Sequence, residues 1–350
     1  MKKVSSRAIN LKFLRVPLFA SFLVLVIFLS VRLCENIKIP SLDKESIGII
    51  LQTNNALALQ ENNHGVFLFL KKVENVPFQK EEALFKAESP KSKKPDIVNK
   101  TVASQNDDID VKISNSTNAS IDINSYLSPS LDFLSENFSV LILHTHTTES
   151  YTPSEKYMYT PSDTDRTRDN NFNVVRIGKE IKNILSQNSI NVYHDTTTND
   201  YPSYNGSYNR SSLCAENFIK KDPSIKIVLD IHRDAIVSSG GEKIRYTTKI
   251  DGEDAACIML VAGSNISGLK HNNWAENLSF AAQLQKHIQT VYPNLMRPIN
   301  FRSQRFNQHL APGAIIVEVG SNANTLDEAL LGARCFAKAL SDFLYSQCSQ

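Results

Sequence analysis

The sequence predicts an α/β fold in which a mostly parallel sheet is flanked by helices. From about residue 125, short β-branched apolar runs alternate with longer segments whose apolar residues recur at helical spacing. Helices that alternate with buried strands are typical of a parallel sheet covered on both faces. In addition, three of the apolar runs end abruptly in imidazoles or carboxylates, and ligands of such sheets bind at the carboxyl ends of strands.

The expected elements follow in order along this part of the chain. An Asp-Gly pair at 251–252 joins two β-like runs, 246–250 and 255–261, and predicts a hairpin turn. Thr325, followed three residues later by Glu328, predicts a capping box at the start of the last helix. Further strands are expected at 139–145, 190–194, 225–231 and 314–319. Helices are expected at 172–186, 209–221, 274–291 and 325–345.

The N-terminus has the pattern of a membrane anchor. Basic residues precede the uncharged run Val16–Val31, and Arg32 closes it. As a helix this run would cover about 24 Å, short of a ~30 Å bilayer core, but the flanking arginines can lengthen the span. We expect a cytoplasmic tail at 1–15, a single-pass anchor at 16–33 and the rest of the chain outside the cytoplasm. A removed signal peptide and a buried helix are the alternatives, although the sequence after the run does not suit signal cleavage.

The composition changes twice between the anchor and the folded domain. Residues 34–87 mix apolar patches with charged flanks, and we expect a juxtamembrane region with a short helix or two and no compact fold. Residues 88–124 are rich in Lys, Ser, Asn and Asp with almost no aromatics, so they predict a disordered linker. The folded domain is therefore expected at 125–350.

The overall composition excludes some classes of function. The chain of 350 residues has a formal net charge of +2, which does not indicate a nucleic-acid partner. Its five cysteines are scattered and include no Cys-x-x-Cys pair, which argues against a disulfide framework and against a Cys-type zinc site. We therefore look for the chemistry of the chain at the predicted strand ends.

The residues at the three strand ends suit a zinc site. His144, His146 and Glu149 follow the first run, His232 ends the second and Glu318 ends the third. Histidine with carboxylate is the donor set of catalytic zinc, and hydrolysis also needs a carboxylate that moves a proton. His144 and His146 point to the same face while the strand lasts, so one can bind the metal while the other orients it or contacts substrate.

Several neighbouring residues have open alternatives. Either Asp230 or Asp234 can supply the carboxylate that fixes the tautomer of the imidazole between them. Glu318 can instead be a structural carboxylate paired with Arg302 or Arg305.

The Tyr-, Ser- and Asn-rich segment 201–211 also has two interpretations. It is either an ordinary surface loop, with Ser207 or Asn209 capping the next helix, or a sugar- or peptide-binding wall. Its residue types favour neither.

Six motifs occur together in the expected domain. They are His144-Thr-His-Thr-Thr-Glu-Ser-Tyr151, Pro202-Ser-Tyr-Asn-Gly-Ser-Tyr208, Asp230-Ile-His-Arg-Asp234, Asn273-Trp-Ala-Glu-Asn-Leu278, Phe306-Asn-Gln308 and Pro312-Gly-Ala-Ile-Ile-Val-Glu-Val-Gly320. In this order and spacing they resemble the stage II sporulation protein P family. The resemblance implies a membrane-anchored peptidoglycan hydrolase of endospore formers that acts in engulfment, with a partner that is a stage II sporulation protein D-like lytic transglycosylase.

The resemblance also implies roles for single residues. The family's catalytic domain is similar to zinc-dependent N-acetylmuramoyl-L-alanine amidases, so His232 and one of the two histidines after the first strand are implied zinc ligands. Glu318 matches the catalytic glutamate of those enzymes. Their third ligand is a glutamate at the start of the first helix, where this chain has asparagines, so Glu149 is the nearest substitute. One departure is Thr198-Asn199-Asp200, where His-Asp is expected before the Tyr-Pro motif.

We therefore expect a Zn²⁺-dependent hydrolase anchored in the cell membrane, with its catalytic domain extracytoplasmic. Its expected reaction is cleavage of the amide between N-acetylmuramic acid and L-alanine, and also of peptide cross-links. A zinc peptidase acting on peptide stems is an alternative among enzymes. A non-catalytic cell-wall-binding scaffold of the engulfment machinery is the alternative outside them, and the intact His and Glu positions argue against it.

Overall fold

The structure, a computed structural model, describes residues 57–62, 65–70, 97–101, 110–134, 137–162 and 165–348. The chain divides into two compact units, Met1–Lys91 and Ser92–Gln350. The expected tail at 1–15 and anchor at 16–33 lie outside the described residues. Within the described ranges, no helix combines the length and hydrophobicity that crossing a bilayer requires.

The first unit contains a β-hairpin. β1 (Leu57–Asn62) pairs antiparallel with β2 (Gly65–Leu70). The expectation of short helices in the juxtamembrane region is wrong for these two segments. The run 66–70 is short, aromatic and preceded by a glycine, and these features favour a strand over a helix.

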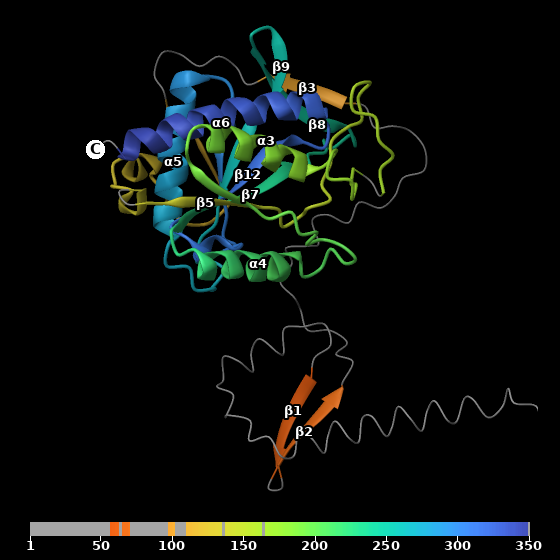
Figure 1. Cartoon of the computed structure of the whole chain (residues 1–350), viewed down its shortest axis with the longest axis vertical. Helices are drawn as coiled ribbons and strands as arrows, with labels where there is room; N and C mark the ends of the chain where they lie inside the picture. Colours follow the sequence, from red (N-terminus) through yellow and green to blue (C-terminus); the bar gives the residue numbers. More distant parts are fainter. Residues whose placement is uncertain are drawn as a thin grey trace, which may run out of the picture. The chain divides into compact units, whose positions relative to one another are not determined.

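A seven-stranded sheet forms the centre of the second unit (Figure 1). Its strands are ordered β4-β11-β10-β12-β7-β5-β6, and every neighbouring pair is parallel except β10 with β12. The predicted α/β class with a mostly parallel sheet is therefore confirmed. The strands are β4 (Ile113–Asn115), β5 (Ser139–Leu143), β6 (Asn191–His194), β7 (Ile225–Asp234), β10 (Ile258–Ala262), β11 (Ile299–Phe301) and β12 (Gly313–Ser321).

Helices cover both faces of this sheet, three on one face and α4 on the other (Figure 1). The alternation of side chains along β7 shows the two layers. Ile227 and Leu229 lie in the large core with α3, α5 and α6, whereas Val228 lies in a smaller cluster with Ala215 of α4. The helices are α3 (Val174–Gln187), α4 (Ser207–Lys221), α5 (Trp274–Val291) and α6 (Leu326–Cys348).

Local signals in the sequence set the starts of two helices. At α6 the amide of Thr325 donates to Glu328 Oε2 at 3.2 Å, and the amide of Glu328 donates to Thr325 Oγ1 at 3.4 Å. This reciprocal pair is the predicted capping box. At α3 the side chain of Asn173 accepts from the amide of Val175 at 3.0 Å, so one of the asparagines before this helix is its N-cap.

A second sheet has the order β3-β8-β9, and it corrects the predicted hairpin. β8 (Lys243–Ile250) does pair antiparallel with β9 (Glu253–Ala256), but the expected second strand is divided at Cys257. The amide of Cys257 still donates to the carbonyl of Tyr246 in β8, while the carbonyl of Cys257 accepts from the amide of Gly320 in β12. β10 then continues into the main sheet, so one apolar run serves two sheets.

The expected linker at 88–124 is wrong where the structure describes it. β3 (Ile97–Thr101) pairs parallel with β8, and β4 forms the edge of the main sheet beside β11. The domain therefore begins well before residue 125. The polar composition predicted a linker because most side chains of β3 and β4 are exposed. These strands are attached by backbone pairing rather than by burial of apolar side chains.

Candidate active site

Three neighbouring parallel strands bring the predicted residues to one edge of the main sheet. β12, β7 and β5 are adjacent, so their carboxyl ends meet. Glu318 on β12 is the register partner of His232 on β7, which places the two side chains on the same face. The chain leaves β5 after Leu143 and turns back past His146 and Glu149.

His232 lies between two carboxylates. Its Nε2 is 2.9 Å from Asp230 Oδ1, and its Nδ1 is 3.5 Å from Glu149 Oε2. Burial alone would lower the pKa of this imidazole, but Asp230 and Glu149 outweigh burial and raise the pKa well above its usual value. Of the two aspartates considered from the sequence, Asp230 is the one beside His232, since Asp234 pairs with Arg297 at 2.8 Å.

His146 is the second imidazole of the cluster. Its ring centroid is 5.2 Å from that of His232, and its Nε2 is 2.9 Å from the hydroxyl of Tyr204. Burial lowers the pKa of His146 to about 3, so its ring is neutral near pH 7. Its Nδ1 is buried and has no hydrogen-bond partner among the described atoms.

His144 does not join this cluster. Its Nδ1 is 3.1 Å from the carbonyl of Ile231, and its Nε2 is 2.8 Å from His194 Nε2. Both rings pack against Gly178 of α3, on the opposite side of the sheet from α4. The expectation that His144 and His146 share a face fails because β5 ends at Leu143, before the alternation of a strand can apply to them.

Glu149 is buried and held by cations. Its carboxylate lies 3.8 Å from Arg233 and 3.7 Å from Arg166, and it also accepts from the amide of Arg233 at 3.2 Å. Burial would raise its pKa, but Arg233 and His232 outweigh burial and hold the pKa well below its usual value. Glu149 is therefore an anion at the centre of the cluster.

Arg166 supports Glu149, and no motif of the sequence indicated this contact. Arg166 Nη1 also donates to Asp200 Oδ2 at 2.6 Å, and Asp200 accepts from the amide and the hydroxyl of Thr148. Asp200 is the aspartate of the segment noted as departing from the family pattern. Here it ties Arg166 to the turn that carries His146 and Glu149.

Glu318 is less constrained than Glu149. The residue is partly exposed, but its Oε2 is buried without a hydrogen-bond partner among the described atoms. Burial and the nearby Asp234 raise its pKa to about 8. The alternative of a structural ion pair has no support in the contacts, because Arg302 bonds Gln304 and Arg305 donates to the carbonyl of Lys270.

The tyrosine-rich segment lies against the cluster. Tyr204 stacks on His146 with ring centroids 4.3 Å apart, and Tyr208 approaches His146 edge-on at 5.6 Å. Tyr208 also contacts Phe306 at 5.7 Å, which extends the aromatic surface. Gly206, and neither of the two residues suggested from the sequence, is the N-cap of α4. Of the two interpretations, this geometry favours a wall beside the site.

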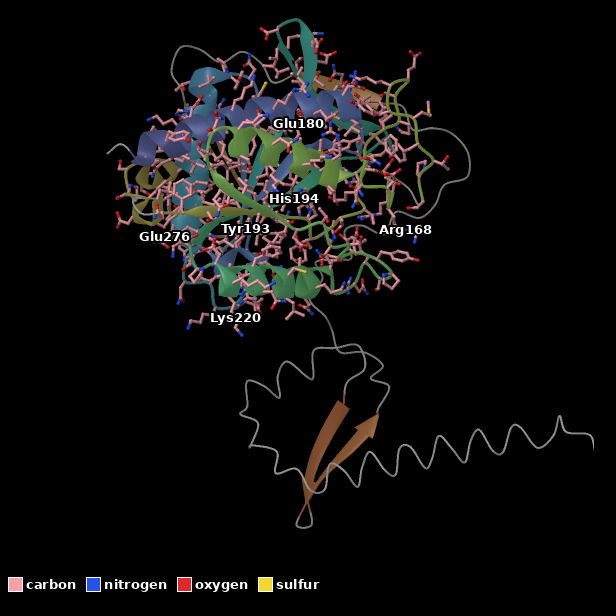
Figure 2. The ribbon with its side chains drawn as sticks, viewed as in Figure 1. Arg168, Glu180, Tyr193, His194, Lys220 and Glu276 are labelled. Carbon is pink, nitrogen blue, oxygen red and sulfur yellow. The ribbon has the colours of Figure 1, made fainter. Side chains whose placement is uncertain are left out.

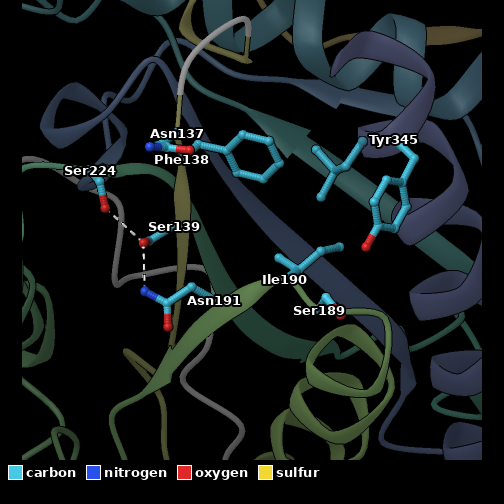
Figure 3. A pocket seen from close by; sticks show the side chains of 9 residues that line it. Asn137, Phe138, Ser139, Ser189, Ile190, Asn191, Ser224 and Tyr345 are labelled. Carbon is cyan, nitrogen blue, oxygen red and sulfur yellow. Dashed lines mark hydrogen bonds between the residues drawn. The ribbon is translucent and has the colours of Figure 1, made fainter. Parts of the chain in front are cut away.

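A separate pocket of about 400 Å³ lies at the amino ends of β5 and β6, away from this cluster (Figure 3). Ser139 Oγ lies 2.7 Å from Ser224 Oγ there and accepts from Asn191 Nδ2 at 2.8 Å. The residues that line it include no imidazole or carboxylate, so the pocket lacks the acid–base groups that gather at the other end of the sheet.

The arrangement can support acid–base chemistry. A carboxyl group with a pKa near neutrality can take up and return a proton, and Glu318 lies beside the imidazole of His232 and near the anionic carboxylate of Glu149. No three His, Cys, Asp or Glu side chains in the described parts of the chain already have the arrangement of a metal site.

Comparisons with known proteins agree with the motifs. Stage II sporulation protein P of Bacillus subtilis (strain 168) is 27% identical over 219 residues, which cover 59% of this chain and 51% of that protein. The chain thus spans about half the length of the curated relative it matches.

Solved structures with a similar arrangement include two amidases. An N-acetylmuramoyl-L-alanine amidase from Clostridium difficile 630 is 17% identical with a TM-score of 0.36, over 61% of this chain and 99% of that chain. The catalytic domain of CwlV, an N-acetylmuramoyl-L-alanine amidase from Bacillus (Paenibacillus) polymyxa var. colistinus, is 12% identical with a TM-score of 0.36, over 60% and 97%. At these values the likeness carries no conclusion about chemistry.

The match to a family profile covers much more of the chain. The profile of stage II sporulation protein P matches residues 44–341, which include the hairpin of the first unit, both sheets and the whole candidate site. The resemblance predicted from the motifs is thereby confirmed, and the chain belongs to the stage II sporulation protein P family.

Proposed function

We propose that the chain is a zinc-dependent peptidoglycan hydrolase that cleaves the amide between N-acetylmuramic acid and L-alanine, and also peptide cross-links, during sporulation. The observation that carries this proposal is the grouping of His146, His232 and Glu149 at one sheet edge, with Glu318 next to His232 on the adjacent strand. The family to which the chain belongs supports a role in sporulation.

The donor set fits zinc in one specific respect. His146 has a hydrogen-bond partner on Nε2, the hydroxyl of Tyr204, whereas His232 Nε2 lies 2.9 Å from Asp230 Oδ1 and has no hydrogen-bond partner among the described atoms. In zinc sites, ligating imidazoles are oriented by such partners and bind through the other nitrogen. Here the buried nitrogens without a hydrogen-bond partner are Nδ1 of His146 and Nε2 of His232. His146, Glu149 and His232 would therefore hold the ion.

When bound, zinc supplies Lewis acidity for amide hydrolysis. His232 would hold the ion as a neutral imidazole, so the proton that Asp230 and Glu149 favour on it would be released. Glu318 takes the proton of the attacking water and returns it to the leaving nitrogen. Asp230 orients His232, and Arg166 and Arg233 keep Glu149 in place. Tyr204 and Tyr208 form the adjacent wall for the substrate.

We also propose that the anchor at 16–33 holds the domain at the outer side of the cell membrane. A stage II sporulation protein D-like lytic transglycosylase is the proposed partner, since it would cut the glycan strands of the same polymer. Protease added to intact protoplasts should remove the domain and leave a small membrane-bound stub. Full-length chain that survives this treatment would contradict the topology.

Digestion of purified cell wall tests the reaction. The full chain is incubated with wall, with and without a chelator, and the products are identified by mass spectrometry. Free stem peptides with an N-terminal alanine mean amidase activity, and shortened cross-links mean endopeptidase activity. If the wall releases neither product, the chain is a non-catalytic scaffold. Hydrolysis by metal-free chain would remove zinc from the proposal.

A further inference from the structure

Two arginine–tyrosine stacks join the tyrosine-rich loop to the segment beside Glu149. The Cζ atom of Arg166 is 5.0 Å from the ring centroid of Tyr204, and that of Arg168 is 4.5 Å from the ring of Tyr201. Arg166 forms an isolated antiparallel bridge with Glu149, so the backbone is extended there. The Arg166–Tyr204 stack therefore lies next to the His146–Glu149 cluster, and the Arg168–Tyr201 stack follows it along both segments.

The two arginines differ in what else they contact. The guanidinium of Arg166 is occupied by Asp200, Thr148 and Glu149. Arg168 is exposed, and no carboxylate in the described part of the chain pairs with it. The adjacent carboxylate of Asp169 instead accepts from the amide and side chain of Asn171. Figure 2 shows Arg168 at the margin of the domain.

Stacking leaves the hydrogen-bonding edge of Arg168 available. A guanidinium that lies against a ring uses its face, whereas its N–H donors lie in its plane. That planar edge matches a carboxylate, which it can bind through two parallel hydrogen bonds. Tyr201, which is 50% exposed, also restricts the side chain and so reduces the entropy lost on binding.

The position of Arg168 suits an extended substrate. The guanidinium of Arg166 lies 3.7 Å from the carboxylate of Glu149, and Arg168 follows two residues later along the chain. Tyr204 stacks on His146, and Tyr201 lies three residues before it in the same loop. Arg168 therefore lies further along this loop from the cluster, where the remote part of a peptide bound at the cluster would pass. A ligand there would contact the exposed Tyr201 as well.

We propose that Arg168, held on Tyr201, binds a carboxylate on the peptide arm of the substrate and selects arms in which this group is free over arms in which it is amidated. This inference rests on the proposed function, since it takes the peptide arm of the wall polymer as the ligand. It assigns to Arg168 a part in specificity and none in the chemical step.

Binding without turnover tests the inference. The full chain carrying Glu318→Gln is titrated calorimetrically with a soluble muramoyl peptide, once with free carboxylates and once with them amidated. We expect the free acid to bind on the order of tenfold more tightly, as for a charge-assisted hydrogen-bonded pair at a screened site. Adding Arg168→Gln should abolish this preference, and adding Arg168→Lys should retain only part of it, because an ammonium cannot form the planar pair.

A control variant at another positive charge separates a specific contact of Arg168 from the general electrostatic attraction of the domain for anions. Lys220→Gln removes an exposed positive charge at the far end of α4 (Figure 2), and it should leave the preference intact. An equal preference for the acid with and without Arg168, or no difference between the acid and the amide in the parent, overturns the inference.

The two proposals can fail separately. A chain that binds the acid through Arg168 and releases nothing from wall supports this inference and refutes the hydrolase. A chain that digests wall while Arg168→Gln binds both peptides as the parent does refutes the inference alone.

Discussion

His144 and His146 are two residues apart, yet they lie in opposite kinds of environment. His144 is sealed beneath α3 against His194 and a backbone carbonyl, so both of its nitrogens have partners. His146 faces the α4 side of the sheet, where its ring contacts His232 and the hydroxyl of Tyr204. Its Nδ1 is buried there without a hydrogen-bond partner among the described atoms. The contrast shows that the packing on each face of the sheet, rather than residue type, decides which imidazole is available for chemistry.

Alanine substitution of His144 and of His146 should give the largest difference in zinc content and in wall hydrolysis. His146→Ala should lose bound zinc and wall hydrolysis together, since one of about three protein ligands disappears. His144→Ala should keep zinc while it destabilises the fold by about 1–3 kcal/mol, because His194 loses its partner in a buried site. Metal analysis and chemical denaturation of both variants measure the two effects. Zinc loss in a folded His144→Ala chain would reverse the assignment.

Glu318→Gln should separate proton transfer from metal binding. The amide keeps the size of the side chain but cannot take a proton, so the hydrolysis rate should fall roughly 10²- to 10⁴-fold. Zinc content and melting temperature should stay close to those of the parent. Loss of metal in this variant would instead make Glu318 a ligand and leave Glu149 as the candidate base.

Gly178→Ala should perturb only the α3 side. A Cβ at this position would lie 2.7 Å from His194 Nε2 and 2.8 Å from His144 Nε2, so the two rings must move. We expect a loss of about 1–3 kcal/mol of stability from overpacking, with zinc content unchanged. Lys179→Ala, at the exposed neighbouring position, should stay within about 0.5 kcal/mol of the parent. Equal stability of the two variants would mean that α3 adjusts freely.

The pH dependence of the free energy of unfolding of the metal-free chain should show the raised pKa of Glu318. Its folded pKa of about 8 lies above the usual value of 4.5, so the folded state holds the proton more tightly than the unfolded state. This contribution to stability is fully present below about pH 4.5 and is lost as pH rises through about 8. Urea midpoints at about pH 5 and about pH 9 should therefore differ more for the parent than for Glu318→Gln. Identical differences would show that Glu318 does not titrate with a raised pKa.

The sequence was informative wherever a local pattern determines local structure. The strands that carry His232 and Glu318, the Thr325–Glu328 capping box and the helices followed from periodicity and short-range pairing, although both strands continue two or three residues beyond these side chains. The contacts of His144 were not predictable in this way, because they depend on where β5 stops and on Gly178 of α3.

Long-range partners account for the other differences. Arg166 reaches Glu149 and Asp200 across separations in sequence that no short motif records. The division at Cys257 likewise depends on distant partners, β8 for the residues before it and β12 for those after it, and apolar content alone does not show this.

The strand β4 has a consequence for how the domain can be shortened. Ile113–Asn115 cover the backbone of β11, and the amide of Ile299 donates to Lys112 while Ser116 donates to Phe301. A chain that begins at residue 125 would leave those groups unpaired and would expose a strand edge that contains Ile299 and Phe301. Open edges of this kind recruit strands from other molecules, so such a fragment should self-associate where one that begins near Ser92 stays dispersed.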